Sequence, residues 1–187
     1  MFSLNGTGGS FVYAESVSSP PTFAADEKRA VTDDSTTNGT PNAVIFGGGV
    51  GTDGVYDSGI LVGNARFDLS LSGQDLVVPI RAVNIRMTIS SDGLKATEGT
   101  ISGVAPTEQL VAAMGALMGR FSTDLCTGTT RDGILDSIRQ ASDIMQDGSQ
   151  DPNKECDGIS VGLGFEATRV VVGDIAPAKA PPADPCN

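Results

Sequence analysis

The sequence contains no histidine and no tryptophan among its 187 residues. Histidine is the usual proton carrier near neutral pH and the commonest imidazole ligand of metal ions. Its absence excludes Ser-His-Asp and Cys-His catalysis, together with every histidine-bearing zinc site. Because tryptophan is also absent, Tyr13 and Tyr56 are the only aromatic side chains with a polar end. These absences favour a protein that acts without turnover, and we predict no catalytic residues.

Basic residues are few as well. The chain has 12 Lys and Arg against 23 Asp and Glu, which gives a formal net charge of −11. Binding to DNA or RNA needs a basic surface, so the sequence predicts no nucleic-acid partner. No run reaches the ~20 apolar residues of a membrane-spanning helix, and we expect no direct membrane insertion. The acidic balance and the abundance of small polar residues predict an extracellular or outer-surface location.

Two segments alternate cleanly between apolar and polar residues, over 65–71 and 83–90. This period of two is typical of half-buried strands. Shorter apolar runs predict further strands over 10–17, 55–62, 98–103, 159–165 and 168–172. Pro79 predicts a bend or an edge position within its apolar run. The stretch 18–42 is expected to be a long surface excursion, too polar to bury anything.

The period changes after Thr107, where apolar residues fall at helical spacing. A second helix is predicted over 132–146, with Ile134, Ile138, Ala141 and Met145 on one face. The small residues Gly115 and Gly119 predict a close helix–strand approach in the first helix. The fold class is therefore mainly β, an antiparallel β-sandwich of the jelly-roll kind with a two-helix insertion before the last strands. We expect one domain over 1–175, with the insertion at 107–147 and an extended Pro/Ala tail at 176–187.

The densest polar cluster follows the second predicted helix. Calcium takes six to eight oxygen ligands from carboxylates, amides and carbonyls, which a Gly- and Pro-shaped loop can gather. Calcium is the one cofactor that the sequence allows, and its candidate ligands are Asp147, Asp151, Asn153, Glu155 and Asp157. A solvated loop between the helix and the next strand is the interpretation that the sequence favours, because the spacing is not that of an EF-hand and Lys154 lies inside the cluster.

Three cysteines lie in the C-terminal third. Cys126 and Cys156 bracket the second predicted helix, and we predict a disulfide between them that stabilises the fold by roughly 3–4 kcal/mol. The alternative is a pair of buried free thiols. Cys186 is then the odd residue, which pairs outside the chain, links two chains, or bonds to one of the other two.

The C-terminal half also carries a recognisable pattern. The element Gly99-Thr100-Ile101-Ser102-Gly103-Val104 precedes the two predicted helices, and the segment Cys156–Glu166 closes on the strand I-S-V-G-L-G-F. Over residues 76–175 this order resembles the closing segment of uncharacterised secreted proteins and lipoproteins of gliding and predatory proteobacteria. The resemblance implies a location and an architecture but no activity. Chains of that group often have a more regular Asp-x-Asp-Gly loop, from which Gln150, Pro152 and Lys154 depart.

Our interpretation is a non-enzymatic structural or adhesive domain, secreted or displayed at the cell surface. A binding module for a glycan or small ligand is the first alternative, and it needs a concave patch lined by Tyr13, Tyr56 or a Phe with amides such as Asn42 or Asn64. A subunit of an extracellular assembly, joined through strand edges or the tail, is the second. A carboxylate-dependent hydrolase, with two acids facing one cleft, is the third. The expected partners are thus a surface protein, a glycan or further copies of the chain.

Overall fold

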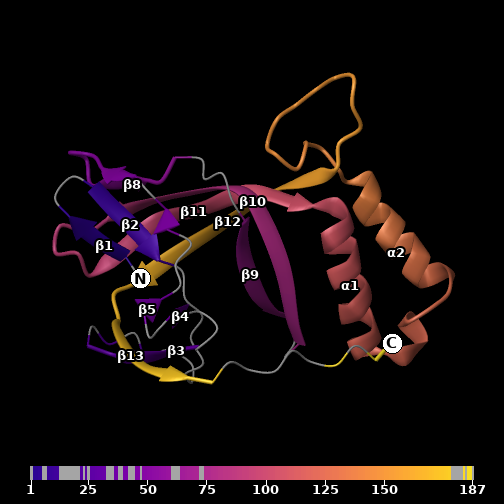
Figure 1. Ribbon diagram of the computed structural model, residues 1–187, viewed down its shortest axis with the longest axis horizontal. Coiled ribbons are helices and arrows are strands. Elements are labelled where there is room, and N and C mark those ends of the chain that lie inside the picture. Colours follow the sequence, from indigo (N-terminus) through magenta and orange to yellow (C-terminus); the bar gives the residue numbers. More distant parts are fainter. Residues whose placement is uncertain are drawn as a thin grey trace. The chain divides into compact units, whose positions relative to one another are not determined.

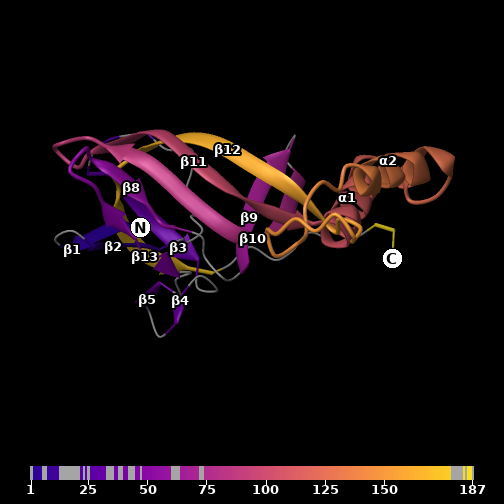
Figure 2. The same ribbon diagram turned by 90° about the horizontal axis from the view of Figure 1, so that it is seen from above.

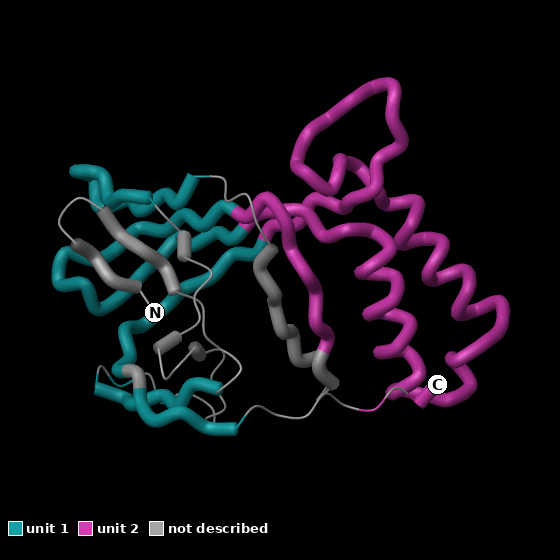
Figure 3. The backbone as a smooth tube through the Cα atoms, in the orientation of Figure 1, with its two compact units in different colours: residues 1–61, 84–101, 163–180 teal, residues 62–83, 102–162, 181–187 magenta. Residues whose placement is uncertain are grey.

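The structure is a computed structural model, and Figure 1 shows its helices and strands. It describes residues 2–5, 8–12, 22, 24, 26–32, 36–37, 40–41, 45–46, 48–59, 64–71, 74–177, 183 and 185–186. The chain divides into two compact units, coloured in Figure 3. Unit 1 comprises 1–61, 84–101 and 163–180, and unit 2 comprises 62–83, 102–162 and 181–187. The single domain expected over 1–175 stays a prediction, and each unit is described by itself.

Most strands belong to one sheet with the order β1-β2-β7-β8-β10-β11-β12, in which β6 also pairs with β2 and β9 with β10. Its members are β1 (Phe2–Asn5), β2 (Gly8–Val12), β6 (Ile45–Phe46), β7 (Gly49–Val50), β8 (Val55–Asp57), β9 (Asn64–Leu71), β10 (Gln74–Ile89), β11 (Lys95–Pro106) and β12 (Gly158–Thr168). Two small sheets accompany it: β13 (Val171–Ala176) with β3 (Lys28–Thr32), and β4 (Thr36–Thr37) with β5 (Thr40–Pro41).

The predicted mainly β class is confirmed, and so is the pair of helices before the last strands. The alternation over 83–90 is reflected in burial, because Val83, Ile85 and Met87 are all at most 3% exposed. The expectation that 18–42 buries nothing is wrong, since β3 contains Val31 and Thr32, both buried. β3 pairs with β13 in parallel, which an all-antiparallel fold did not predict. The packing of two sheets into a jelly-roll sandwich stays a prediction.

The long strand β10 changes partner along its length. Residues 74–81 pair with β9, whereas residues 86–88 pair with β8. Between these two ladders Ala82 adopts φ +48°, a left-handed conformation that residues with a Cβ rarely take. Pro79 itself pairs with Arg66 of β9, and the left-handed residue lies three positions later, at Ala82.

Substitution of Ala82 tests this conformation. Ala82→Val is expected to lower the free energy of unfolding by about 1–3 kcal/mol, because a β-branched residue is strained at positive φ. Ala82→Gly is expected to lower it little or not at all, since glycine takes this conformation freely. Urea unfolding of the two variants measures the difference. Equal destabilisation by Gly and Val would contradict the left-handed geometry.

The helical part belongs to unit 2 and consists of α1 (Thr107–Phe121), the short 3₁₀ helix η2 (Thr123–Leu125) and α2 (Thr129–Gln140). Figures 1 and 2 show α1 and α2 side by side. A small core joins them: Val111, Met118 and Leu135 are buried, with Met114, Leu125 and Ile138 packed around them. Arg139 also binds both carboxylate oxygens of Glu108, at 2.8 and 3.2 Å. That ion pair is exposed and contributes little to stability.

The second helix differs from its prediction in two respects. It ends at Gln140 and not at Gln146, because the chain then turns back toward β12, where Ile144 forms a backbone bridge with Gly158. Its buried residue is Leu135, whereas Ile134 is 41% exposed. Of the predicted apolar face, Ile138 packs against the core between α1 and α2, whereas Ile134 does not share its burial.

Candidate functional site in the helical unit

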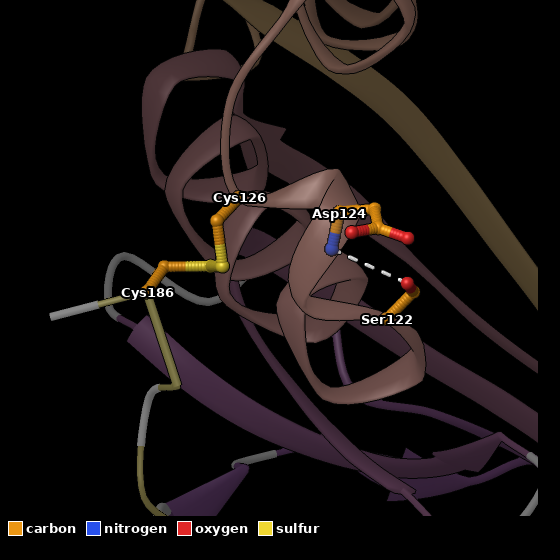
Figure 4. Close-up of a disulfide and its surroundings, with 4 residues drawn as sticks. All are labelled: Ser122, Asp124, Cys126 and Cys186. Carbon is orange, nitrogen blue, oxygen red and sulfur yellow. Dashed lines mark hydrogen bonds between the residues drawn. A yellow bond between two sulfur atoms is a disulfide. The ribbon is translucent and has the colours of Figure 1, made fainter.

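A disulfide ties the end of the chain to the helical unit. Cys126, directly after η2, is bonded to Cys186 with a Cα–Cα distance of 5.2 Å, as Figure 4 shows. Cys156 is a half-buried free cysteine. The predicted Cys126–Cys156 bond is therefore wrong, although one of the pairings left open for Cys186 is the observed one.

The length of α1 explains why Cys126 and Cys156 do not meet. Cys156 precedes Asp157, whose carbonyl accepts a hydrogen bond from the Thr107 amide at the first residue of α1. Cys126 lies beyond the other end of this 15-residue helix, which spans about 22 Å at 1.5 Å per residue. A disulfide needs Cα atoms within about 7 Å of each other.

Both glycines of the α1 small-residue motif have a packing role. A Cβ at Gly119 would overlap Cys186 Sγ and lie 3.2 Å from Cys126 Sγ. A Cβ at Gly115 would lie 2.7 Å from Nη2 of Arg131, at the start of α2. The close approach predicted for these glycines thus brings a disulfide and a guanidinium against the helix, not a strand.

An open hollow of about 470 Å³ lies beside the disulfide. Its lining residues come from the end of α1 and from the tail: Gly119, Arg120, Phe121, Ser122, Thr123, Ala183 and Pro185. Phe121 is 52% exposed, and the Ser122 hydroxyl accepts a hydrogen bond from the Asp124 amide in the wall of the hollow (Figure 4). The hollow therefore presents an aromatic ring beside polar groups.

The five predicted calcium ligands lie in the loop between α2 and β12, and the hydrogen bonds of Asp147 and Asp151 are local. Asp147 accepts hydrogen bonds from the amide and hydroxyl of Ser149, which lower the pKa of its carboxyl group. Asp151 accepts from the Asn153 amide at 3.0 Å and lies 3.5 Å from Lys154 Nζ. Glu155 is exposed to solvent.

Asp157 has a different role in the same loop. Its two carboxylate oxygens accept hydrogen bonds from the backbone amide and the side-chain amide of Gln146, at 2.8 and 2.7 Å. Gln146 in turn accepts a hydrogen bond from Arg81 of β10. Over the ranges that the structure describes, no three His, Cys, Asp or Glu side chains gather into a metal-binding group. Calcium binding therefore stays a prediction from the sequence.

Sequence reasoning missed the carboxylate that holds the start of β12. Asp143 accepts the Ser160 amide at 2.7 Å and the Ser160 hydroxyl at 2.5 Å. These two hydrogen bonds lower the pKa of the Asp143 carboxyl group. The sequence placed Asp143 inside the helix predicted over 132–146, so it gave no signal for this contact.

The Asp143 contact predicts a pH dependence of stability. Its carboxyl pKa is lower in the folded than in the unfolded chain, so the stabilisation is present above the unfolded pKa and is lost as pH falls through the folded pKa. Asp143→Ala is expected to reduce the free energy of unfolding at neutral pH, and the difference from the unmodified chain is expected to shrink below about pH 4. Urea unfolding across this range measures it, with the exposed Asp174→Ala as control. A difference that does not change with pH would contradict the role of the carboxylate.

The aromatic residues predicted for a ligand patch have other positions. Tyr56 is fully buried in β8, and burial raises the pKa of its hydroxyl group. It cannot line a surface patch, which corrects that part of the glycan hypothesis. Tyr13 and Asn42 lie outside the described residues, and Asn64 lies in β9 with its side chain undescribed.

Comparisons with protein families, curated proteins and solved structures find no match for this chain. Among the helices of the described ranges, none is both long and apolar enough to cross a membrane. The disulfide is the feature that bears on location, because disulfides persist in oxidising compartments.

Proposed function

We propose that the chain is a secreted or surface-displayed domain with a structural or adhesive role, which it performs through contact and not through catalysis. The observation that carries this proposal is the Cys126–Cys186 disulfide. A disulfide persists in an oxidising environment, where it is not reduced. The net charge of −11 supports partners other than nucleic acid.

Hydrogen bonds favour the ionised form of several acidic side chains. Six carboxyl groups have a lowered pKa, in each case mainly through a hydrogen bond from a neighbouring side chain: Glu27, Asp57, Asp92, Glu108, Asp143 and Asp147. A carboxylate-dependent hydrolase needs a carboxyl group that stays protonated near neutral pH, which requires a raised pKa. The six groups named above are shifted in the opposite direction, so none of them suits that role.

Thiol labelling in the native host tests the location. Cells are fractionated, each fraction is treated with acid to stop thiol exchange, and free cysteines are then labelled with a maleimide of high mass in denaturant at neutral pH. We expect the chain outside the cytoplasm with a single labelled thiol, on Cys156. A chain found in the cytoplasm with three labelled thiols would overturn the proposal.

A ligand-binding module is the second candidate, and Phe121 favours it. Its half-exposed ring borders the hollow beside the disulfide, where an aromatic ring and polar groups could hold a sugar or a small molecule. A glycan array probed with the unmodified chain and with Phe121→Ala tests this function. Glycan binding that Phe121→Ala abolishes would support the ligand-binding function. If neither the unmodified chain nor the variant binds any glycan, this function is excluded for glycans.

Calcium remains the proposed stabiliser of the acidic loop. If it binds there, the midpoint of thermal unfolding rises with calcium and falls with a chelator, by mass action on the folded state. The variant Asp151→Asn with Asp147→Asn provides the control, because its midpoint would no longer respond. An unchanged midpoint in the unmodified chain would remove calcium from the proposal.

A further inference from the structure

The last strand of the large sheet, β12, is an edge strand. In the strand order β11 is its one neighbour within that sheet. An edge strand presents a row of backbone N–H and C=O groups that another extended chain can pair with. Part of this edge already forms hydrogen bonds with other residues of the chain.

Hydrogen bonds at the start of β12 define which residues face outward. The Asp157 carbonyl accepts from Thr107 after β11, whereas the Gly158 amide donates to Ile144 on the opposite side. The Ser160 amide donates to Asp143 on that same outer side. Because strand residues alternate with period two, the amides of Gly162, Gly164, Glu166 and Thr168 also face outward.

The covered and uncovered parts of the edge are therefore distinct. Ile144 and Asp143 cover the outer side at Gly158 and Ser160. From Gly162 to Thr168 no described residue forms a hydrogen bond on the outer side. This stretch also lacks the usual protections of an edge, because it contains no Lys and no Pro.

The charge of this stretch favours a second copy of the chain as the partner. Two molecules with a net charge of −11 repel each other over most of their surface. Residues 162–168 carry one charge only, that of Glu166, so repulsion there is low. An antiparallel pair centred on Phe165 places Glu166 opposite Gly164 of the second copy and Thr168 opposite its Gly162. In this register no like charges lie directly opposite each other. The outward-facing N–H and C=O groups of each copy form hydrogen bonds with those of the other.

We propose that the chain forms a symmetric dimer by antiparallel pairing of the β12 edges over residues 162–168. This proposal rests on the proposed structural or adhesive function, because it identifies a second copy of the chain as the partner in that function. A Cβ at Gly99 would lie 2.6 Å from Phe165 Cζ, so the Phe165 ring lies over Gly99 of β11 in its own chain, and the backbone hydrogen bonds join the two copies. The pairing is isologous, so it closes at two molecules.

Charge substitution tests the pairing and its register. Gly164→Glu places a glutamate opposite Glu166 of the second copy, twice per dimer, while a side chain at 164 meets only the Gly99 carbonyl at 3.9 Å within its own chain. The added substitution Glu166→Lys converts both contacts into opposite-charge pairs. Gly133→Glu is the matched control, since the surroundings of Gly133 are open and it lies on α2.

Sedimentation velocity over roughly a hundredfold range of concentration measures the dimer dissociation constant of each chain. We expect a dimer for the unmodified chain and for Gly133→Glu, a dissociation constant raised about tenfold or more by Gly164→Glu, and recovery in the double variant. Circular dichroism and the intact disulfide establish that each variant is folded. A monomeric unmodified chain, or a dimer that Gly164→Glu leaves unchanged, would overturn the pairing. Neither result touches the proposed location, which the thiol-labelling experiment decides separately.

Discussion

Removal of the Cys126–Cys186 disulfide is expected to lower the free energy of unfolding by about 4 kcal/mol. The two cysteines are separated by 60 residues, and the loss of such a cross-link increases the chain entropy of the unfolded state. A loss of this size is comparable to the whole stability of many domains. Urea unfolding of Cys126→Ser, Cys186→Ser and the double variant measures it, and the three should be equally destabilised. Cys156→Ser is the control and should change stability much less.

Peptide mapping identifies the bond directly. Trypsin cleaves after Arg120, Arg131, Lys154, Arg169 and Lys179. Without reduction, the peptide 121–131 should therefore be linked to 180–187, while peptide 155–169 carries an alkylated Cys156. A link between 121–131 and 155–169 would restore the pairing predicted from the sequence and would contradict the structure.

Gly119→Ala is expected to have the second large effect, a destabilisation of about 1–3 kcal/mol with incomplete closure of the disulfide. The new methyl group would overlap Cys186 Sγ, and the disulfide cannot move away without shifting the tail. Gly133→Ala is the matched control on α2, where a methyl group meets nothing within 4 Å. It should stabilise the chain by about 0.5–1 kcal/mol, because alanine loses less backbone entropy in a helix than glycine.

The two glycine substitutions thus have opposite expected signs. Thermal unfolding and quantification of free thiols measure stability and disulfide closure in the same samples. Gly119→Ala with full stability and a closed disulfide would show that the tail does not pack against α1 as the structure has it.

The sequence predicted those elements whose periodicity is local. The apolar residues Val83, Ile85 and Met87 alternate with polar residues because one side of β10 is buried. This alternation can be recognised in the sequence alone. The helical spacing of apolar residues after Thr107 can be recognised in the same way, because α1 also buries one side. The short strand β3 was not, because its burial depends on pairing with β13, which is far away in the sequence. The residues of β3 alone do not indicate that it pairs with β13.

The predicted site failed for a related reason. Cys156 is nearer than Cys186 to Cys126 in the sequence, but the length of α1 separates them in space. The acidic loop contains oxygen ligands at close spacing, but Asp147 and Asp151 cap their own turns and Asp157 holds Gln146. Spacing along the chain indicates which side chains are available, whereas the hydrogen-bond partners decide how they are used.

The disulfide also determines what happens when the backbone is cut. Lys154 is well exposed in the acidic loop, where a trypsin-like protease has access to the peptide bond that follows it. The cut would fall between Cys126 and Cys186, so the two fragments would remain joined by the sulfur–sulfur bond. A nicked molecule would keep both pieces in place and would separate into two bands only on a reducing gel.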